Sequence, residues 1–397
     1  MKILYLVNYF PPSSGAAALN SKKIVDILIE YGHKIKILAP GDMGKTLVLK
    51  GRKRKEIPNI QINYSNKLIK SPLSWILSHN ENMIKFLIKS RDKFNPDLIM
   101  SQYHPFHYAS VCSNYIAKKR KIPHVVRSHD IFIDLKSHSF LYNLHILMNY
   151  PQIFRSIIKS DIFYVTTSEM RKYFLKIKKL KDVNFKIHHN GIDVLEFFPD
   201  KNQEILKQKF GCETIISFIG LMTEDIGVHN FIKYLPDVFK IYKDAHLILI
   251  GDGPYKKQIL SYIYKLGLSK KVHFLGIKPH DDIPFYINNS DIGIGRITHK
   301  KMWRYMIPVK CLEYMACGKP FLSTPISQDV LKNNDVGFLL KRDYSKDDLI
   351  NKMSILIDDE NLRKKLGENG LKKIHNEYKW ECLMEDFNNN ITELVKG

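Results

Sequence analysis

The sequence predicts an α/β protein with two domains, each built around a doubly wound parallel sheet. Two separate β-α-β series support this prediction, one opening at residue 2 and the other at residue 215, because such alternation is typical of parallel sheets. The chain of 397 residues is long enough to bury two hydrophobic cores. The turn-forming pair Asn190-Gly191 stands between the two series, and we expect the domain boundary near residues 195–212.

The first series begins with a strand at residues 2–9. Ile24, Val25 and Leu28 recur at helical spacing after it, and Gly32 ends that helix. Ser168 is predicted as the N-cap of a later helix, since its hydroxyl can accept a hydrogen bond from the first turn. The other strands expected here are KIKILAP (34–40), PDLIMSQY (96–103), PHVVRSHD (123–130) and the start of SDIFYVTTSEMRKYF (160–174).

The second series leads to the stretch PVKCLEYMACGKPFLST (308–324), which predicts a loop, a short helix and a buried strand. Pro308 suits the first helical position, because its fixed φ is helical and its missing N–H would have no partner there. Gly318 and Pro320 end the helix. The other expected elements are strands at 215–221, 245–254, 272–276 and 291–295, and helices near 228–243, 281–289, 346–357, 360–376 and from about 378 onwards.

The charge of the chain is high and unevenly distributed. The formal net charge is +22; residues 1–200 hold 32 Lys/Arg against 15 Asp/Glu, and residues 201–397 hold 30 against 25. A one-sided positive field indicates a polyanionic partner, namely an acidic membrane, a phosphate-bearing lipid or a nucleic acid. An AT-rich genome would also enrich lysine, but it would not explain the asymmetry.

Two segments of the basic half could contact a membrane. Residues 44–56 form a basic loop, which is either simply solvated or in contact with an anionic surface. Residues 71–91 combine Trp75 and many apolar residues with lysines, as an amphipathic helix does. A helix of this pattern lies on a bilayer or packs against a core, and the pattern fits both.

The cysteines and the hydropathy predict a cytoplasmic protein. The five cysteines have no metal-binding spacing, so we interpret them as reduced thiols. No apolar run approaches the roughly 18 residues of a membrane span. The N-terminal strand lacks the cleavage site of a signal peptide. A peripheral position on the inner face of the membrane is compatible with the basic first half.

Two side chains are predicted to lie where parallel sheets of this kind bind their ligands. Glu313 lies in the second turn of a helix whose start could hold phosphate, and its carboxylate can accept hydrogen bonds from two vicinal hydroxyls, as on a ribose. The alternative is an ordinary surface glutamate. His129 follows a parallel strand at its carboxyl end, where ligands bind; the alternative is a histidine bonded to nearby backbone. Gly15, in the first β-α turn, is either functional or merely steric.

The motif K-x-L-E-Y-M-A-C-G-K-P at residues 310–320, together with the Asn-Gly-Ile-Asp turn at 190–193, resembles glycosyltransferase family 4. This resemblance implies the GT-B fold, with two Rossmann-like domains facing each other across a crevice. The expected parts are an acceptor domain at 1–195, a nucleotide-sugar domain at 212–377 and a C-terminal helix at 378–397 that packs back on the first domain. It also implies retaining transfer of a sugar from a nucleotide donor to a hydroxyl of a lipid-linked or polysaccharide acceptor.

The resemblance also assigns roles to residues of this chain. His129 contacts the donor sugar and Glu313 the donor ribose, and these two form the expected catalytic set. Lys310 and the Val309 and Lys310 amides hold the diphosphate, and the leaving phosphate helps to deprotonate the acceptor. No metal or cofactor is required, and no nucleic acid is expected, because no binding motif accompanies the basic runs. The full expected donor site is Gly15, Ala16, Gly220, Gly276, Arg296, Val309, Lys310, Leu312 and Glu313.

The sequence departs from the family pattern at four positions, the first of which is Ala16, where the family usually has a second glycine after Gly15. Leu221 and Ile226 stand where the family usually has an Arg and a Lys, and Tyr305 replaces the first of two glutamates. One interpretation is that the phosphate-binding cations have moved to Arg296, Lys300, Lys301, Arg304 and Lys310. Alternatively, the chain is a degenerate scaffold protein of a glycan-assembly complex, or it is a different GT-B enzyme such as a nucleotide-sugar epimerase.

Overall fold

The computed structural model describes residues 1–8, 10, 16–38, 60–63, 94–103, 109–129, 131, 151–200, 204–330 and 335–397. The chain divides into two compact units, Met1–His189 with Leu383–Gly397, and Asn190–Cys382. The N-terminal stretch of the first unit thus ends at His189, whereas the sequence analysis expected this domain to end at residue 195. The basic loop at 44–56, the segment 71–91 and Gly15 lie outside the described residues.

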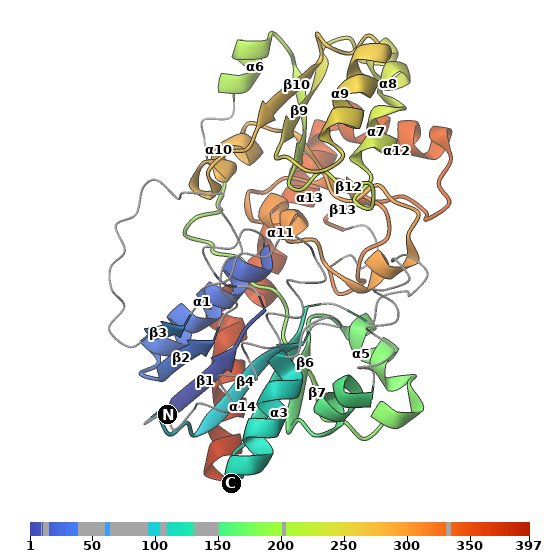
Figure 1. The fold of residues 1–397 in the computed structure, drawn as a ribbon. Coiled ribbons are helices and arrows are strands. Elements are labelled where there is room, and N and C mark those ends of the chain that lie inside the picture. The colour runs from blue at the N-terminus through green and yellow to red at the C-terminus, as the bar shows by residue number, and fades with distance from the viewer. Residues whose placement is uncertain are drawn as a thin grey trace. The chain divides into compact units, whose positions relative to one another are not determined.

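The first unit contains a seven-stranded sheet among its described residues, in the order β3-β2-β1-β4-β5-β6-β7, with every pair parallel. Since the chain order reverses between β1 and β4, this sheet has a topological switch point there. Figure 1 shows these strands in blue to green. Their bounds are β1 Lys2–Leu6, β2 Lys34–Leu38, β3 Ile60–Asn63, β4 Leu98–Tyr103, β5 His124–Ser128, β6 Ile162–Val165 and β7 Phe185–Ile187.

Helices cover both faces of this sheet. Leu4 and Leu6 of β1 pack in one buried cluster with α3 (Ala109–Arg120). Tyr5 points to the opposite face, where its phenol lies near Ser21 of α1 (Ala16–Glu30). The helix α5 spans Ser168–Leu175 and the 3-10 helix η2 spans Lys178–Leu180. The predicted cap was wrong by one residue, because the hydroxyl of Thr167 accepts from Met170 N and Ser168 is already helical.

The C-terminal helix α14 (Trp380–Lys396), red in Figure 1, belongs to the first unit from Leu383 onwards. The ring of Phe387 lies 4.8 Å from the ring of Tyr164 in β6 and 4.8 Å from that of His188. Asn388 bonds to His33 Nε2 at 2.6 Å. Lys186 of β7 also donates to Asn390 Oδ1. The helix is therefore attached to this unit by both aromatic and polar contacts, as the fold prediction expected.

The second unit contains a six-stranded parallel sheet among its described residues, in the order β10-β9-β8-β11-β12-β13. Its switch point lies between β8 and β11. The strands are β8 Thr214–Ile219, β9 Ala245–Ile250, β10 Val272–Gly276, β11 Ile292–Ile294, β12 Phe321–Ser323 and β13 Gly337–Leu339. The helices are α6 Ile205–Phe210, α7 Val228–Ile232, α8 Leu235–Ile241, α9 Lys256–Lys265, η3 His280–Asp282, α10 Ile283–Asn288, η4 Lys301–Tyr305, α11 Val309–Ala316, α12 Lys346–Asp358, α13 Glu360–Lys373 and η5 Ile374–Tyr378.

Two details of the second unit differ from the prediction. The helix expected over 228–243 is two helices, because Pro236 stands at the start of α8 and cannot donate to a continuing helix. Pro308 is the N-cap of α11 rather than its first helical residue, with an extended ψ of 126°.

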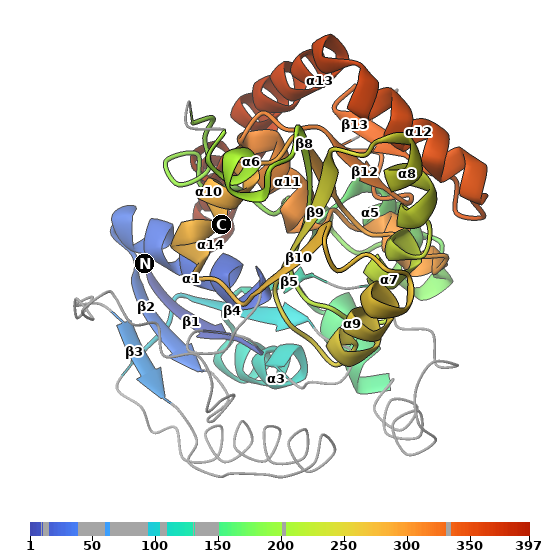
Figure 2. The ribbon, with the colours of Figure 1, turned by 90° about the horizontal axis from the view of Figure 1, so that it is seen from above.

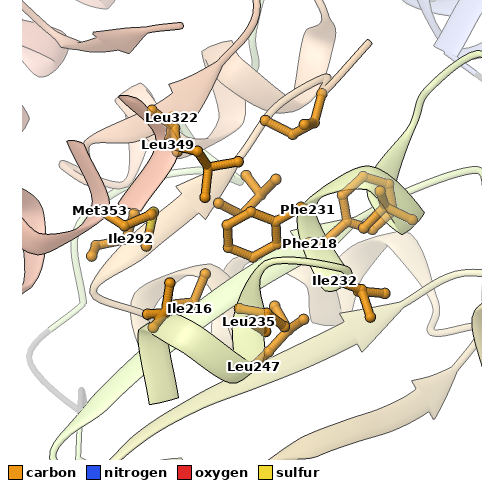
Figure 3. Packing of buried hydrophobic residues seen from close by; sticks show 14 of the residues in the cluster. Ile216, Phe218, Phe231, Ile232, Leu235, Leu247, Ile292, Leu322, Leu349 and Met353 are labelled. Carbon is orange, nitrogen blue, oxygen red and sulfur yellow. The ribbon is translucent and has the colours of Figure 1, made fainter. Parts of the chain in front are cut away.

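The core of the second unit has two layers, one on each face of the sheet. Figure 2 shows α7, α8 and α9 on one side of β8 and β9, and α10 and α11 on the other. Figure 3 shows the first layer, in which side chains from α7, α8 and α12 interlock over the sheet. The labelled members are Ile216, Phe218, Phe231, Ile232, Leu235, Leu247, Ile292, Leu322, Leu349 and Met353. No helix among the described residues has the length and apolar character needed to cross a membrane.

The carboxyl ends of β8, β9 and β10 are crowded together at three glycines. Gly251 N donates to Gly276 O at 2.8 Å, and a Cβ built on Gly251 would lie only 2.0 Å from Gly220 O. Gly251 also has a φ of +126°, a backbone conformation that residues other than glycine rarely adopt. This edge of the sheet therefore depends on the absence of a side chain.

We expect Gly251→Ala to destabilise the protein far more than Gly267→Ala. Gly267 also has a positive φ of +67°, but a Cβ there meets nothing within 4 Å, so its substitution costs only the strain of roughly 1–2 kcal/mol. Melting temperatures of both variants, measured under the same conditions, test this. Equal losses would mean that the strand ends can separate to admit a methyl group.

Candidate active site

The helix α11 lies directly against the carboxyl ends of β8 and β11. The phenol of Tyr314 donates to Ser217 O at 3.0 Å, and a Cβ on Gly293 would lie 2.4 Å from the Tyr314 ring. Cys311 and Leu312 are fully buried in the same layer. Leu312, an expected donor-site residue, thus contributes its side chain to the core that holds the helix in place.

The amine of Lys310 is buried at the first turn of α11. Its Nζ has no hydrogen-bond partner among the described residues. It lies 3.8 Å from the centre of the Phe218 ring, and a Cβ on Gly220 would be 3.0 Å from it. Burial lowers the pKa of Lys310 to about 7, and the nearby charge of Arg296 contributes to that lowering. A cation held in this way gains strongly from a bound anion.

Arg296 follows β11 and is the second cation near this point. Its guanidinium carbon lies 3.8 Å from the centre of the Trp303 ring, a cation–π contact that holds the side chain flat. Its backbone N donates to Ser323 Oγ at 3.1 Å, so the end of β12 fixes its position. The charge of Arg296 acts on Lys310, whose pKa it helps to lower.

The other cations proposed for this site have different surroundings. Lys300 forms an ion pair with Asp225, and Arg304 donates to the Tyr305 hydroxyl at 2.8 Å. The side chain of Lys301 is outside the described residues. Leu221, in the place of the family arginine, is 57% exposed, while Ile226 packs against the core. The amine of Lys310 lies beside Gly220, immediately before Leu221.

Glu313 lies one turn beyond Lys310 and is half-buried. Burial raises the pKa of its carboxyl group, while His280 and Lys310 lower it and Glu196 raises it. His280 lies 3.7 Å from the Glu196 carboxylate. The charges of His280 and Glu196, from two other segments, thus act on the Glu313 carboxyl group.

The remaining predicted donor residues are placed as follows. Gly276 ends β10 with a φ of +70°, and Val309 is the first residue of α11, where helical N–H groups have no partner within the helix. Ala16 is the first residue of α1. No group of three His, Cys, Asp or Glu side chains suited to a metal ion occurs among the described residues.

His129 lies in the first unit, just beyond β5, and contacts a buried arginine. Arg127 Nη1 is 2.7 Å from His129 Nε2 and 3.1 Å from Nδ1. Arg127 Nε donates to His188 Nδ1 at 2.9 Å. The sequence analysis did not identify Arg127 and His188 as site residues. Their position at the ends of β5 and β7, each close to another histidine, was the signal that could have indicated them.

Comparison with known proteins agrees with this architecture. Residues 200–373 match the family model described as Glycosyl transferases group 1. N-acetyl-alpha-D-glucosaminyl L-malate synthase of Bacillus anthracis is 24% identical over 399 residues, covering 95% of this chain and 93% of that protein. An uncharacterised glycosyltransferase of Methanocaldococcus jannaschii is 21% identical over 401 residues, covering 97% of this chain and 96% of that protein.

The crystal structure of Anabaena HepE in complex with UDP has the same fold. Its TM-score is 0.74 at 17% identity, with 99% of this chain and all of that chain covered. The chain is thus an enzyme of the glycosyltransferase type with the GT-B fold. The match to the group 1 glycosyltransferase model lies within its second unit.

We expect Lys310→Met to raise the melting temperature at pH 7, because it removes a buried amine without a partner among the described residues. The folded-state pKa of Lys310, about 7, is below the ordinary 10.5, so the unfolded chain binds the extra proton between these values. Wild-type stability therefore gains from this group as pH rises from 7 towards 10.5. The advantage of the variant should shrink over that range; an advantage independent of pH would contradict the buried charge.

Proposed function

We propose that the enzyme transfers a sugar from a nucleotide-sugar donor to a hydroxyl of a lipid-linked or polysaccharide acceptor, with retention at the anomeric carbon. The observation that supports this most is the buried Lys310 amine, which has no hydrogen-bond partner among the described residues. A diphosphate at the start of α11 would supply the missing acceptor atoms, and helical N–H groups would add to its binding. HepE, which shares the fold, was solved with UDP.

The proposed roles follow the positions of the residues. Lys310, Arg296 and the first amides of α11, from Val309 onwards, stabilise the negative charge that develops on the leaving diphosphate. Glu313 accepts hydrogen bonds from the ribose hydroxyls. Gly276 leaves its backbone accessible to the nucleobase, and Gly220 makes room for the Lys310 amine.

The first unit supplies the acceptor side of the proposed reaction. His129 contacts the donor sugar, while the turn of Gly15 and Ala16 approaches the donor. The leaving phosphate accepts the acceptor proton, so the proposal requires neither a protein base nor a metal. The cations at Lys310 and Arg296 replace those absent at Leu221 and Ile226, which favours an active enzyme over a degenerate scaffold.

We propose that the basic first unit binds an anionic membrane that carries the acceptor. Between residues 170 and 181 the chain has no Asp or Glu, and the cations there are exposed on and beside α5 and η2. Such a surface attracts anionic lipids at about 1 kcal/mol per cation. These cations are Arg171, Lys172, Lys176, Lys178, Lys179 and Lys181.

A nucleotide panel tests the donor site. Thermal shifts are measured with UDP, GDP, ADP and their common sugar conjugates, and a ligand at a hundred times its dissociation constant should stabilise the protein by ~2.7 kcal/mol. The shift should be lost in Glu313→Ala and in Lys310→Met. The exposed Glu368→Ala of the same unit is the matched control and should retain it. No shift with any nucleotide would overturn the proposal and favour the scaffold.

Vesicle co-sedimentation tests the membrane surface. The protein should bind phosphatidylcholine vesicles that contain phosphatidylglycerol, bind less as salt increases, and not bind pure phosphatidylcholine. Lys178→Glu with Lys179→Glu should weaken this binding. Lys257→Glu with Lys265→Glu, on α9 of the second unit, is the control of equal charge change. If both double variants lose binding equally, the membrane contact is not specific to the first unit.

A further inference from the structure

The amine of Lys310 lies in surroundings that do little to stabilise a positive charge. Its Nζ is buried and has no hydrogen-bond partner among the described residues. It lies 3.8 Å from the centre of the ring of Phe218, a side chain that is itself fully buried. On another side it approaches Gly220, where a Cβ would lie 3.0 Å from it. An ammonium group in this position is costly, because it has left water without gaining an acceptor from the described residues.

The titratable groups around this amine only partly offset that cost. On the same helix, the Glu313 carboxyl group favours the charged amine. The Cys311 thiol does so only when it is ionised, and burial raises its pKa to about 12. Arg296, which follows β11, disfavours the charged amine. The neighbours from β8 and its end, Phe218 and Gly220, carry no ionisable group. Burial therefore dominates, and it lowers the pKa of the amine to about 7.

We infer that the donor diphosphate binds together with one proton, which the solvent supplies to Lys310 Nζ. This inference rests on the proposed binding of the diphosphate at the start of α11. A neutral amine offers the phosphates no positive charge, whereas an ammonium group offers a charge and three N–H donors. The anion therefore stabilises the protonated form that burial disfavours. The only covalent change in this step is the new N–H bond, formed from the lone pair of Nζ.

A buried lysine makes the site sensitive to pH in a range where an arginine would not. A guanidinium group keeps its proton in proteins, whereas a buried ammonium group loses it readily. Arg296 therefore adds a constant charge, and the pH dependence comes from Lys310.

The direction of the pH dependence follows from the lowered pKa of Lys310. Below pH 7 most of the amine is already protonated before the anion binds, so binding takes up little additional proton. Above pH 7 most of the amine is neutral, and the proton must be taken from solvent at a cost in affinity. If the bound amine stays protonated throughout, the affinity for the donor falls by roughly 25-fold from pH 6.5 to pH 8.5.

Isothermal titration calorimetry on the full-length protein tests this coupling. UDP-glucose, GDP-mannose and ADP-glucose are titrated at pH 6.5 and pH 8.5, because both phosphates of these compounds are esterified and do not change charge in this range. Titrations at pH 8 in HEPES and in Tris, whose heats of ionisation differ, give the number of protons taken up. We expect one of these nucleotide sugars to bind about 25-fold more weakly at pH 8.5, and to bind with uptake of about 0.9 proton at pH 8.

Lys310→Arg tests whether this lysine is the source of the coupling. The arginine cannot lose its charge, so the affinity of the variant should differ by less than about twofold between the two pH values, with almost no proton uptake. Lys319→Arg is the matched control, because Lys319 follows the same helix and burial lowers its pKa to about 8. This control should keep the pH dependence and the proton uptake of the wild type.

The outcomes separate this inference from the proposed function. Equal wild-type affinity at both pH values, or proton uptake that persists in Lys310→Arg, would overturn the inference while donor binding stands. If none of the three nucleotide sugars binds at either pH, the proposed donor site is wrong and the inference fails with it. If Lys310→Arg does not fold, the wild type and Lys319→Arg decide: proton uptake in both supports the inference, and its absence from either overturns it.

Discussion

The close approach of α11 to the carboxyl ends of β8 and β11 is the constraint on which the second unit depends. Tyr314 can reach Ser217 only because Gly293 has no side chain, and the Lys310 amine lies close to Gly220. The apolar face of the helix fills the core, with Leu312 and Cys311 fully buried. The polar face, with Lys310 and Glu313, is thereby fixed at the strand ends where ligands bind in such sheets.

Both units use a buried cation, but in different ways. Lys310 rests on an aromatic ring and against a glycine, and its lowered pKa is the sign of a charge that still lacks a strong partner among the described residues. Arg127 instead donates to acceptors that follow β7, namely His188 Nδ1 and the carbonyl oxygens of His188 and His189. The first arrangement is suited to receive an anion, since binding would relieve the cost of burial. The second is suited to hold other side chains still.

In the proposed donor site, Leu221 and Ile226 stand where the family that this chain resembles usually has an Arg and a Lys. The side chain of Lys310 is long and flexible, so it reaches from α11 to Gly220, which directly precedes Leu221. Arg296, held flat by Trp303, adds a second charge. In our proposal, these two cations take the place of the missing pair.

The sequence alone determined the two sheets, the fold and the short helix within Pro308–Thr324, because periodicity, turns and caps are local signals. It also pointed to Lys310, Glu313 and His129, which lie at strand ends or a helix start. It could not reveal the bond of Arg127 to His188 or the approach of Lys310 to Gly220, because both depend on contacts between segments distant in the chain. The break of the helix at Pro236 is by contrast a local signal, since proline cannot donate to a continuing helix. Only tertiary packing decides which side chains meet at the edge of a sheet.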